Sequence, residues 1–142
     1  MSTGKVAKML TEKQLLRAPR KDYMNGEQLE FFRQRLLDLR KELGVRLERA
    51  KAELSEEHRE CDELDRASVE EDINLKVRAL NRDSKLLPKI EEALRRIEDG
   101  SYGYCEATGA PIGIERLLLR PTAAFSAEEK NRQEAIEQAY RS

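Results

Sequence analysis

The chain has 142 residues, of which 39% are charged and 39% hydrophobic, while aromatic residues make up 5% and tryptophan is absent. This composition favours long solvated helices with one apolar stripe over a thick globular core. The longest aliphatic run, Leu117-Leu118-Leu119, is far shorter than the roughly 20 apolar residues of a membrane span. Without a signal-peptide core or a disulfide framework, we expect a cytoplasmic protein and neither a membrane protein nor a secreted one.

The net charge of −1 conceals an uneven distribution of charge along the chain. Residues 1–52 carry 13 Lys/Arg against 7 Asp/Glu, residues 53–72 carry 2 against 10, and residues 73–142 carry 12 against 11. The helix dipole accounts for acids in a first helical turn, but not for ten of them in one segment. A general nucleic-acid binder would present a basic face, so direct sequence-specific DNA binding is not expected.

The chain begins with a basic leader, residues 1–24, in which Pro19 and weak periodicity allow only a short helix. A clearer helix starts at Asn25, the expected N-cap, and Gln28 completes a capping-box pattern. Apolar residues then recur at alternating steps of three and four, as in the seam of a coiled coil. They are Leu29, Phe32, Leu36, Leu39, Leu43, Leu47, Ala50 and Leu54.

A second seam follows after the acidic segment, and Asp99-Gly100 is its expected C-terminal stop. Two such stripes joined by a short connection predict an antiparallel hairpin over 25–99, with helices about 45 Å long and a tip near 58–68. Pro88 is expected to kink the second helix or to mark its emergence from the hairpin. The second seam consists of Val69, Ile73, Val77, Leu80, Leu87, Ile90, Leu94 and Ile97.

Residues 100–142 differ in kind, because turn formers alternate with short apolar pieces up to about residue 125. We predict zinc-finger-like turns with a short β-hairpin, a helical or extended piece over 115–119, and a C-terminal helix that Ser126 caps. The expected small core of this region consists of Tyr102, Tyr104, Ile112, Ile114, Leu117 and Phe125.

Four positions in this region have the spacing of a C-x₂-C…C-x₂-C zinc site, namely Cys105, Thr108, Ser126 and Glu129. Structural zinc takes four cysteine or histidine ligands, and hydroxyl groups do not supply comparable affinity. Zinc is therefore not expected, and these are degenerate metal positions. No catalytic triad, P-loop or nucleotide-binding glycine motif is present in the sequence, so an enzyme is not expected either.

Several motifs together resemble the DksA family of bacterial RNA polymerase-binding transcription factors, over about residues 22–141. They are Asp22-Tyr23-Met24-Asn25, Asp62-Glu63-Leu64-Asp65-Arg66-Ala67, Ala79-Leu80-Asn81-Arg82-Asp83, Tyr102-Gly103-Tyr104-Cys105-Glu106, Ile112-Gly113-Ile114-Glu115-Arg116-Leu117 and Arg120-Pro121-Thr122-Ala123. The resemblance implies a mainly α protein in which a coiled coil projects from a small globular domain. Because Thr108, Ser126 and Glu129 replace family cysteines, the chain looks like a zinc-independent member.

The resemblance also implies a function and a set of site residues. DksA-like proteins insert the coiled-coil tip through the secondary channel of RNA polymerase and act with ppGpp in the stringent response, inhibiting rRNA promoters and activating amino-acid promoters. The tip positions are Asp62, Asp65 and Ala67, and Arg82 matches a polymerase-binding position. The ppGpp-binding positions are Lys89, Arg120 and Lys130, with Leu86 as an apolar neighbour.

Two other functions remain open on the sequence. A transcript-cleavage factor of the Gre type shares an acidic hairpin tip, and a structural coiled-coil adapter would need only the seams. For the favoured function the partners are RNA polymerase and ppGpp, and we expect a monomer with no membrane association and no resident cofactor.

Overall fold

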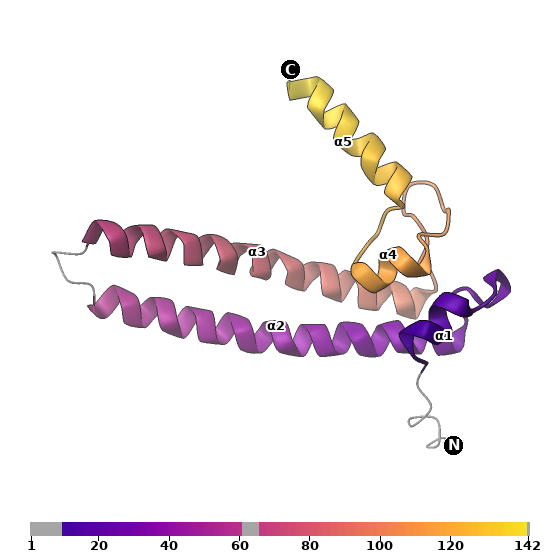
Figure 1. Cartoon of the computed structure of the whole chain (residues 1–142), viewed down its shortest axis with the longest axis horizontal. Coiled ribbons are helices and arrows are strands. Elements are labelled where there is room, and N and C mark those ends of the chain that lie inside the picture. The colour runs from indigo at the N-terminus through magenta and orange to yellow at the C-terminus, as the bar shows by residue number, and fades with distance from the viewer. Residues whose placement is uncertain (1–9, 61–65, 142) are drawn as a thin grey trace. The chain divides into compact units, whose positions relative to one another are not determined.

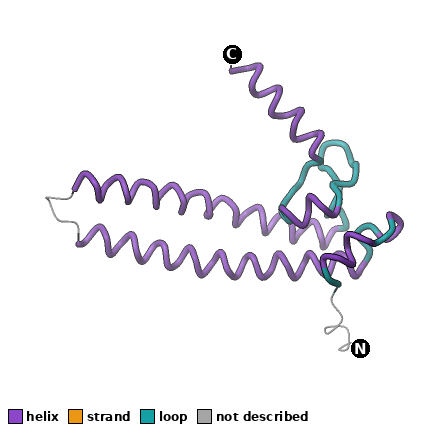
Figure 2. Tube along the Cα trace, in the orientation of Figure 1, coloured by secondary structure: helices purple, strands orange, loops and turns teal. Residues whose placement is uncertain are grey.

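The computed structural model describes residues 10–60 and 66–141, and among these the side chains of 58–60, 66 and 67 are not described. Within these ranges the chain is helical and has no strand (Figure 2). It forms two compact units, one of Met1–Leu36 with Glu92–Ser142 and one of Leu37–Glu91. The elements in Figure 1 are α1 (Glu12–Arg17), the 3₁₀ turn η2 (Arg20–Asp22), α2 (Gly26–Glu60), α3 (Arg66–Asp99), α4 (Ile114–Leu119) and α5 (Ala127–Arg141).

The mainly α fold with two long helices is thus confirmed, and the cap of the first long helix is as predicted. The Asn25 carboxamide oxygen accepts a hydrogen bond from the Gln28 amide at 2.9 Å. The return bond differs from a standard capping box, because Gln28 Oε1 accepts from the Met24 amide, also at 2.9 Å. The buried Gln28 side chain therefore holds the residue before the cap.

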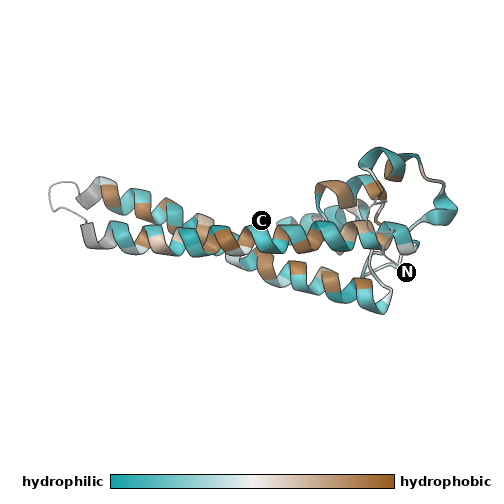
Figure 3. Ribbon diagram, turned by 90° about the horizontal axis from the view of Figure 1, so that it is seen from below, coloured by the Kyte–Doolittle hydropathy of each residue, from teal (hydrophilic) through white to brown (hydrophobic). Residues whose placement is uncertain are grey.

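In the unit Leu37–Glu91, α2 and α3 lie side by side and antiparallel (Figure 1). Figure 3, coloured by hydropathy, shows hydrophobic residues recurring between hydrophilic ones along both helices. The predicted seam is confirmed here, because each of its members in this unit is buried or half-buried. Those that are most fully buried are Leu43, Leu47, Leu54, Ile73 and Ile90.

Within the described residues, ion pairs cross this hairpin at three levels. Arg40 pairs with Glu91 at 3.1 Å, Arg46 pairs with Asp83 through two bonds of 3.0 and 3.3 Å, and Lys76 pairs with Glu57. Between the outer two pairs the chain advances 17 residues along α2 and 15 along α3, so the two antiparallel helices stay in step over this length.

Helix α3 continues as one helix through Pro88 and ends at Asp99, as the predicted stop requires. A proline inside a helix removes one amide donor, and the flanking turns on either side sustain the helix here. The kink expected at Pro88 stays a prediction. Beyond Asp99, Gly100 has φ +87°, a left-handed conformation that favours glycine after a helix.

The first unit adds a short helix that the leader sequence only allowed. The Thr11 hydroxyl caps α1, and Gln14 returns a bond to the Thr11 amide, a complete capping box. The buried Leu15 lies on α1, which packs against α4, and Glu12 pairs with Arg35 of α2 at 2.8 Å.

The segments between α3 and α5 form two stretches that we call the finger loops, residues 100–113 and 120–126. The β-hairpin predicted here is wrong, because only a single bridge pairs Tyr104 with Pro111. Gly103 and Gly109, both at positive φ, turn the chain too often for a ladder to extend. The predicted helical piece is confirmed as α4, and α5 starts after Ser126 as expected. None of the helices in the described ranges is long and apolar enough to cross a bilayer.

Candidate functional site

A tyrosine joins three of the sequence motifs in the first unit. The Tyr23 hydroxyl donates a hydrogen bond to the Gly103 carbonyl at 2.6 Å and accepts one from the Gly113 amide at 2.8 Å. Its ring packs edge-on against Tyr104, with centroids 5.5 Å apart. Burial raises the pKa of Tyr23, so its hydroxyl stays protonated and available as a donor. The segment before α2 is thereby fixed to two points of the first finger loop, Gly103 and Gly113.

Gly103 is a position that only glycine fits. Its φ is +90°, and a Cβ built there would lie 2.6 Å from Met24 Cγ and 2.7 Å from Met24 Sδ. Met24 itself is buried and has φ +55°, which is rare for a residue with a side chain. The missing side chain of Gly103 therefore makes room for the Met24 side chain.

The predicted core of the finger loops is confirmed in part. Tyr102, Ile112 and Leu117 are buried, whereas the other three predicted members are half-buried. The Tyr102 hydroxyl donates to the Pro121 carbonyl at 2.8 Å, which ties the two finger loops together. Burial raises the pKa of Tyr102 strongly, so this hydroxyl also remains a donor.

Cys105 is the cysteine among the degenerate metal positions, and 3% of its surface is exposed. Burial disfavours its thiolate, but hydrogen bonds from the Thr108 hydroxyl and from the amides of Ser126, Thr108 and Ala107 outweigh that penalty. Together they lower the pKa of Cys105 from 9.0 to about 6. A pKa lowered to about 6 favours the thiolate form of Cys105 at neutral pH.

The other degenerate positions are already engaged. Ser126 Oγ accepts from the Glu129 amide at 3.1 Å, and the buried Glu129 carboxylate accepts from Arg132 and Gln133 at 3.0 Å. These bonds lower the pKa of Glu129, with the Arg132 bond as the largest cause. One thiolate, two hydroxyls and a carboxylate paired with arginine do not match the four-thiolate set that the zinc of a C4-type finger takes. Nor do three His, Cys, Asp or Glu side chains gather as a metal site anywhere in the described part of the chain.

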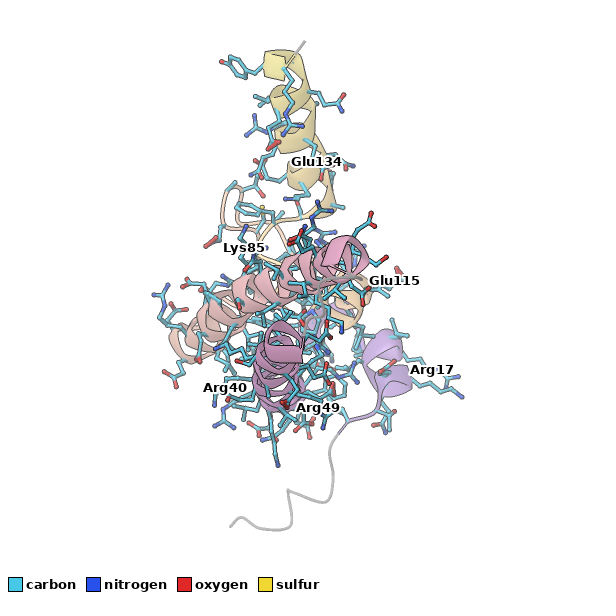
Figure 4. All side chains as sticks on the ribbon, turned by 90° about the vertical axis from the view of Figure 1, so that its left-hand side faces the viewer. Arg17, Arg40, Arg49, Lys85, Glu115 and Glu134 are labelled. Atoms are coloured by element: carbon cyan, nitrogen blue, oxygen red, sulfur yellow. The ribbon has the colours of Figure 1, made fainter. Side chains whose placement is uncertain are left out.

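Two of the predicted ppGpp positions line one groove between α4 and α5, with a volume of about 580 Å³. Arg120 follows α4 and Lys130 lies in the first turn of α5, so both cations belong to the same unit. Sequence reasoning did not identify the other residues that line this groove. A usable signal was the four-residue spacing of Arg116 and Arg120, which places a second cation on the same helical face. Glu115 and Glu134, labelled in Figure 4, supply acids from α4 and α5. We call this the cationic groove, and its lining is Glu115, Arg116, Leu119, Arg120, Ala127, Lys130, Asn131 and Glu134.

The remaining predicted site residues lie either in the other compact unit, Leu37–Glu91, or outside the described residues. Leu86 and Lys89 lie one turn apart on α3 in the unit Leu37–Glu91, where Leu86 is half-buried and Lys89 exposed. Arg82, also exposed, lies on the same helix. The tip residues Asp62 and Asp65 lie outside the described residues, and Ala67 is described only as part of α3.

Arg96 is a buried charge that sequence reasoning missed, because it stands beside seam position Ile97 and reads as a surface residue. Its side chain is 6% exposed, and Nη1 lies 4.0 Å from Glu92 Oε2 and 3.9 Å from Glu106 Oε1. Its carbonyl accepts from the amides of Ser101 and Tyr102. Arg96 therefore links the C-terminal end of α3 to the first finger loop through both its side chain and its carbonyl.

Two family models match successive parts of the chain. The DksA N-terminal domain, described as the DnaK suppressor protein DksA, matches residues 28–97. The prokaryotic dksA/traR C4-type zinc finger matches residues 100–135, which contain the finger loops, α4 and most of α5. The first match covers most of both long helices, and the second contains all four degenerate metal positions.

Curated relatives and a solved structure agree with these matches. The chain is 47% identical over 120 residues to the RNA polymerase-binding transcription factor DksA of Caulobacter vibrioides, covering 84% of each chain. It is 42% identical over 106 residues to the protein of that name from Escherichia coli, covering 74% of this chain and 70% of the relative. The solved structure of transcription factor DksA2 from Pseudomonas aeruginosa is 48% identical, has a TM-score of 0.81, and covers 90% of this chain and 99% of that one.

A long helical hairpin joined to a finger-like region defines the general class, and the comparisons define the family. This chain belongs to the DksA family of RNA polymerase-binding transcription factors.

Proposed function

We propose that this protein binds RNA polymerase and regulates transcription initiation, acting in the cytoplasm together with ppGpp. The observation that carries the proposal is the extent of its identity to relatives named RNA polymerase-binding transcription factors, 47% over 84% of both chains. The resemblance of its motifs to the DksA family supports the stringent response as the setting.

The acidic hairpin supports entry of the tip into the secondary channel of the polymerase. Residues 37–60 of α2 form an arm about 36 Å long at 1.5 Å per residue. The residues that follow it in the sequence belong to the segment 53–72, which has ten acids and two arginines. An acidic tip on a narrow, registered rod is suited to act near a Mg²⁺ site, and Asp62, Asp65 and Ala67 are the proposed acting residues. Arg82 is the proposed polymerase contact on the rod.

The cationic groove supports binding of an anionic effector. Arg120 and Lys130 line it together with Arg116, and such side chains bind phosphate groups by charge and by their N–H donors. We propose that Arg120 and Lys130 bind ppGpp in the complex with polymerase, and that Lys89 and Leu86 on α3 are further ppGpp positions. The protein itself needs no resident cofactor for this action, and we propose that it acts as a monomer without zinc.

The deciding experiment is transcription by purified RNA polymerase with and without ppGpp. We expect the protein to reduce transcripts from an rRNA promoter, to increase those from an amino-acid biosynthesis promoter, and to do both more strongly with ppGpp. No change at either promoter, with polymerase binding absent, would favour a structural adapter. Efficient cleavage of backtracked transcripts on addition of the protein would instead favour the Gre-type function.

The tip is tested by Asp65→Asn, with Asp38→Asn as the matched control. Asp38 is an exposed residue of α2, so both variants lose one negative charge by the same substitution. We expect Asp65→Asn to bind polymerase almost as well as the original protein but to lose inhibition of the rRNA promoter. Inhibition that survives Asp65→Asn would contradict the role proposed for the tip.

The cationic groove is tested by Arg120→Ala and Lys130→Ala, with Lys41→Ala as a control at an exposed cation of α2. We expect the two groove variants to keep the effect measured without ppGpp and to lose its enhancement by ppGpp. Lys41→Ala should keep both. Full ppGpp enhancement in both groove variants would show that the effector binds elsewhere.

A further inference from the structure

The cationic groove contains acids as well as cations. Its lining brings Arg116, Arg120 and Lys130 together with Glu115 and Glu134. An acid beside bound phosphates repels them, so a lining of both signs fits a ligand that carries hydrogen-bond donors in addition to phosphates. We propose that Glu134 recognises the guanine base of the bound effector and makes the groove selective for guanine over adenine nucleotides. This inference rests on the proposed function, because it takes ppGpp as the ligand of the groove.

The charged side chains of the groove are largely unused by the protein itself. Within the described residues, those of Arg120, Lys130 and Glu134 form no hydrogen bond or ion pair. Lys130 and Glu134 stand four positions apart on α5, a spacing at which opposite charges can pair, but no ion pair joins these two described residues. Arg116 differs, because its Nε donates to the Phe125 carbonyl at 3.0 Å. Arg120, Lys130 and Glu134 are therefore available to a ligand.

Glu134 differs from the other acid of the groove in its place on a helix. Glu115 lies in the first turn of α4, where the helix dipole favours an acid. Glu134 lies at the middle of α5, where the dipole has no such preference. Both side chains are exposed, and both are labelled in Figure 4. Helix electrostatics therefore accounts for Glu115 but not for Glu134.

The lining of the groove offers each kind of contact that a nucleotide needs. Lys130 lies in the first turn of α5, and Glu134 lies one turn further along the same face, with Asn131 beside it. Leu119, which is 89% exposed, and Ala127 add apolar surface to the same lining. The groove, of about 580 Å³, thus offers cations for phosphates, apolar surface for a base or ribose, and a carboxylate for the edge of the base.

Guanine and adenine present opposite groups to a carboxylate. Guanine carries two adjacent donors, its N1–H and its exocyclic amino group, and the two oxygens of one carboxylate can accept both. Adenine has a bare N1 in the same place, an acceptor that faces the carboxylate without a proton between them. Leaving a charged acceptor without its donor costs binding free energy, and such unpaired groups give strong discrimination between ligands. Glu134 is therefore a specificity-determining residue, and it takes no part in a reaction.

The test is transcription from an rRNA promoter by purified RNA polymerase with the full-length protein. Two nucleotides are titrated, ppGpp and its adenosine counterpart with the same phosphates, and the effect of each on polymerase without the protein is subtracted. The variant is Glu134→Gln, whose amide offers one donor and one acceptor and so suits adenine better than guanine. Glu115→Gln is the matched control, because it removes the same charge from the same groove. The measured quantity is the ratio of the half-maximal concentrations of the two nucleotides, in which changes in phosphate binding cancel.

We expect the original protein to respond to ppGpp at a concentration about tenfold lower than to the adenosine counterpart. Glu134→Gln should reduce this preference by about tenfold, whereas Glu115→Gln should keep it within about twofold.

Two results would overturn this inference and leave the proposed function standing, provided that ppGpp still enhances the effect of the original protein. One is a preference for ppGpp that Glu134→Gln leaves unchanged or that both variants reduce equally. The other is an equal response of the original protein to the two nucleotides. Absence of any ppGpp enhancement in the original protein would overturn this inference and the proposed ppGpp response together.

Discussion

The hairpin and the finger loops are stabilised in opposite ways. In the hairpin the same contact repeats, with an apolar side chain every three or four residues and ion pairs at the surface. In the finger loops almost every contact is unique, from the two bonds of the Tyr23 hydroxyl to the donors around Cys105. A repeating interface depends mainly on buried apolar area, whereas a loop region without strands depends on particular donors and acceptors.

The largest expected effect is on the repeating interface. Leu43 is fully buried in the hairpin seam, and Leu43→Ala removes apolar contacts and leaves a cavity. We expect the free energy of unfolding to fall by about 2–5 kcal/mol in urea denaturation. Val45, exposed on the same helix, gives the control Val45→Ala, for which we expect a change within about 0.5 kcal/mol. Equal losses for the two variants would show that the seam does not hold the hairpin.

The next effect is a pH dependence that arises from Cys105 in the finger loops. The thiol of Cys105 is protonated below about pH 9 in the unfolded chain and ionised above about pH 6 in the folded one. Between these values the unfolded state binds more protons, so stability rises with pH by up to about 1.4 kcal/mol per unit. This contribution is complete above pH 9 and is lost as the pH falls through 6. In Cys105→Ser the increase of unfolding free energy with pH that this thiol causes should vanish, as measured by urea denaturation between pH 6 and 9. An unchanged dependence of stability on pH would contradict the lowered pKa of Cys105.

A smaller effect should follow from removing one hydroxyl in the first unit. Tyr23→Phe leaves the Gly103 carbonyl and the Gly113 amide without their partner. Because an unpaired buried polar group costs its desolvation, we expect a loss of about 1–3 kcal/mol in thermal or urea unfolding. Tyr140→Phe is the matched control, since Tyr140 is 88% exposed and its hydroxyl reaches water. A loss no larger than that of the control would mean that the hydrogen bonds of the Tyr23 hydroxyl do not contribute measurably to the free energy of unfolding.

The smallest effect is expected at the surface of the hairpin. Arg46 and Asp83 form two bonds across α2 and α3, but the arginine is half exposed. A double-mutant cycle with both residues changed to alanine should give a coupling energy below about 1 kcal/mol that shrinks at high salt. A coupling that is several times larger and insensitive to salt would show that ion pairs rather than the seam determine the register.

The same contrast explains what could be predicted from the sequence. Periodic spacing revealed both seams, and local caps such as Asn25 and Ser126 marked helix starts within one residue. The α1 helix had a readable signal too, because Thr11 and Gln14 form a capping box. The partners of Cys105 had no such signal, since one of them is an amide 21 positions away and amides leave no trace in residue identity. The β-hairpin was wrongly expected because alternating apolar pieces suggested strands, whereas Gly103 and Gly109 turn the backbone too soon.

The matched register of the hairpin limits how its length can change. Among the described residues, the ion pairs between α2 and α3 span 17 residues on one helix and 15 on the other, so the two arms contact each other in step along their length. An insertion of seven residues into one arm alone would displace each contact between it and the turn by two helical turns. Insertions of seven residues into both arms at the same level would restore every pair. The reach of the hairpin is therefore set by the lengths of both α2 and α3. Evolution or protein design can change it only by altering the two helices together.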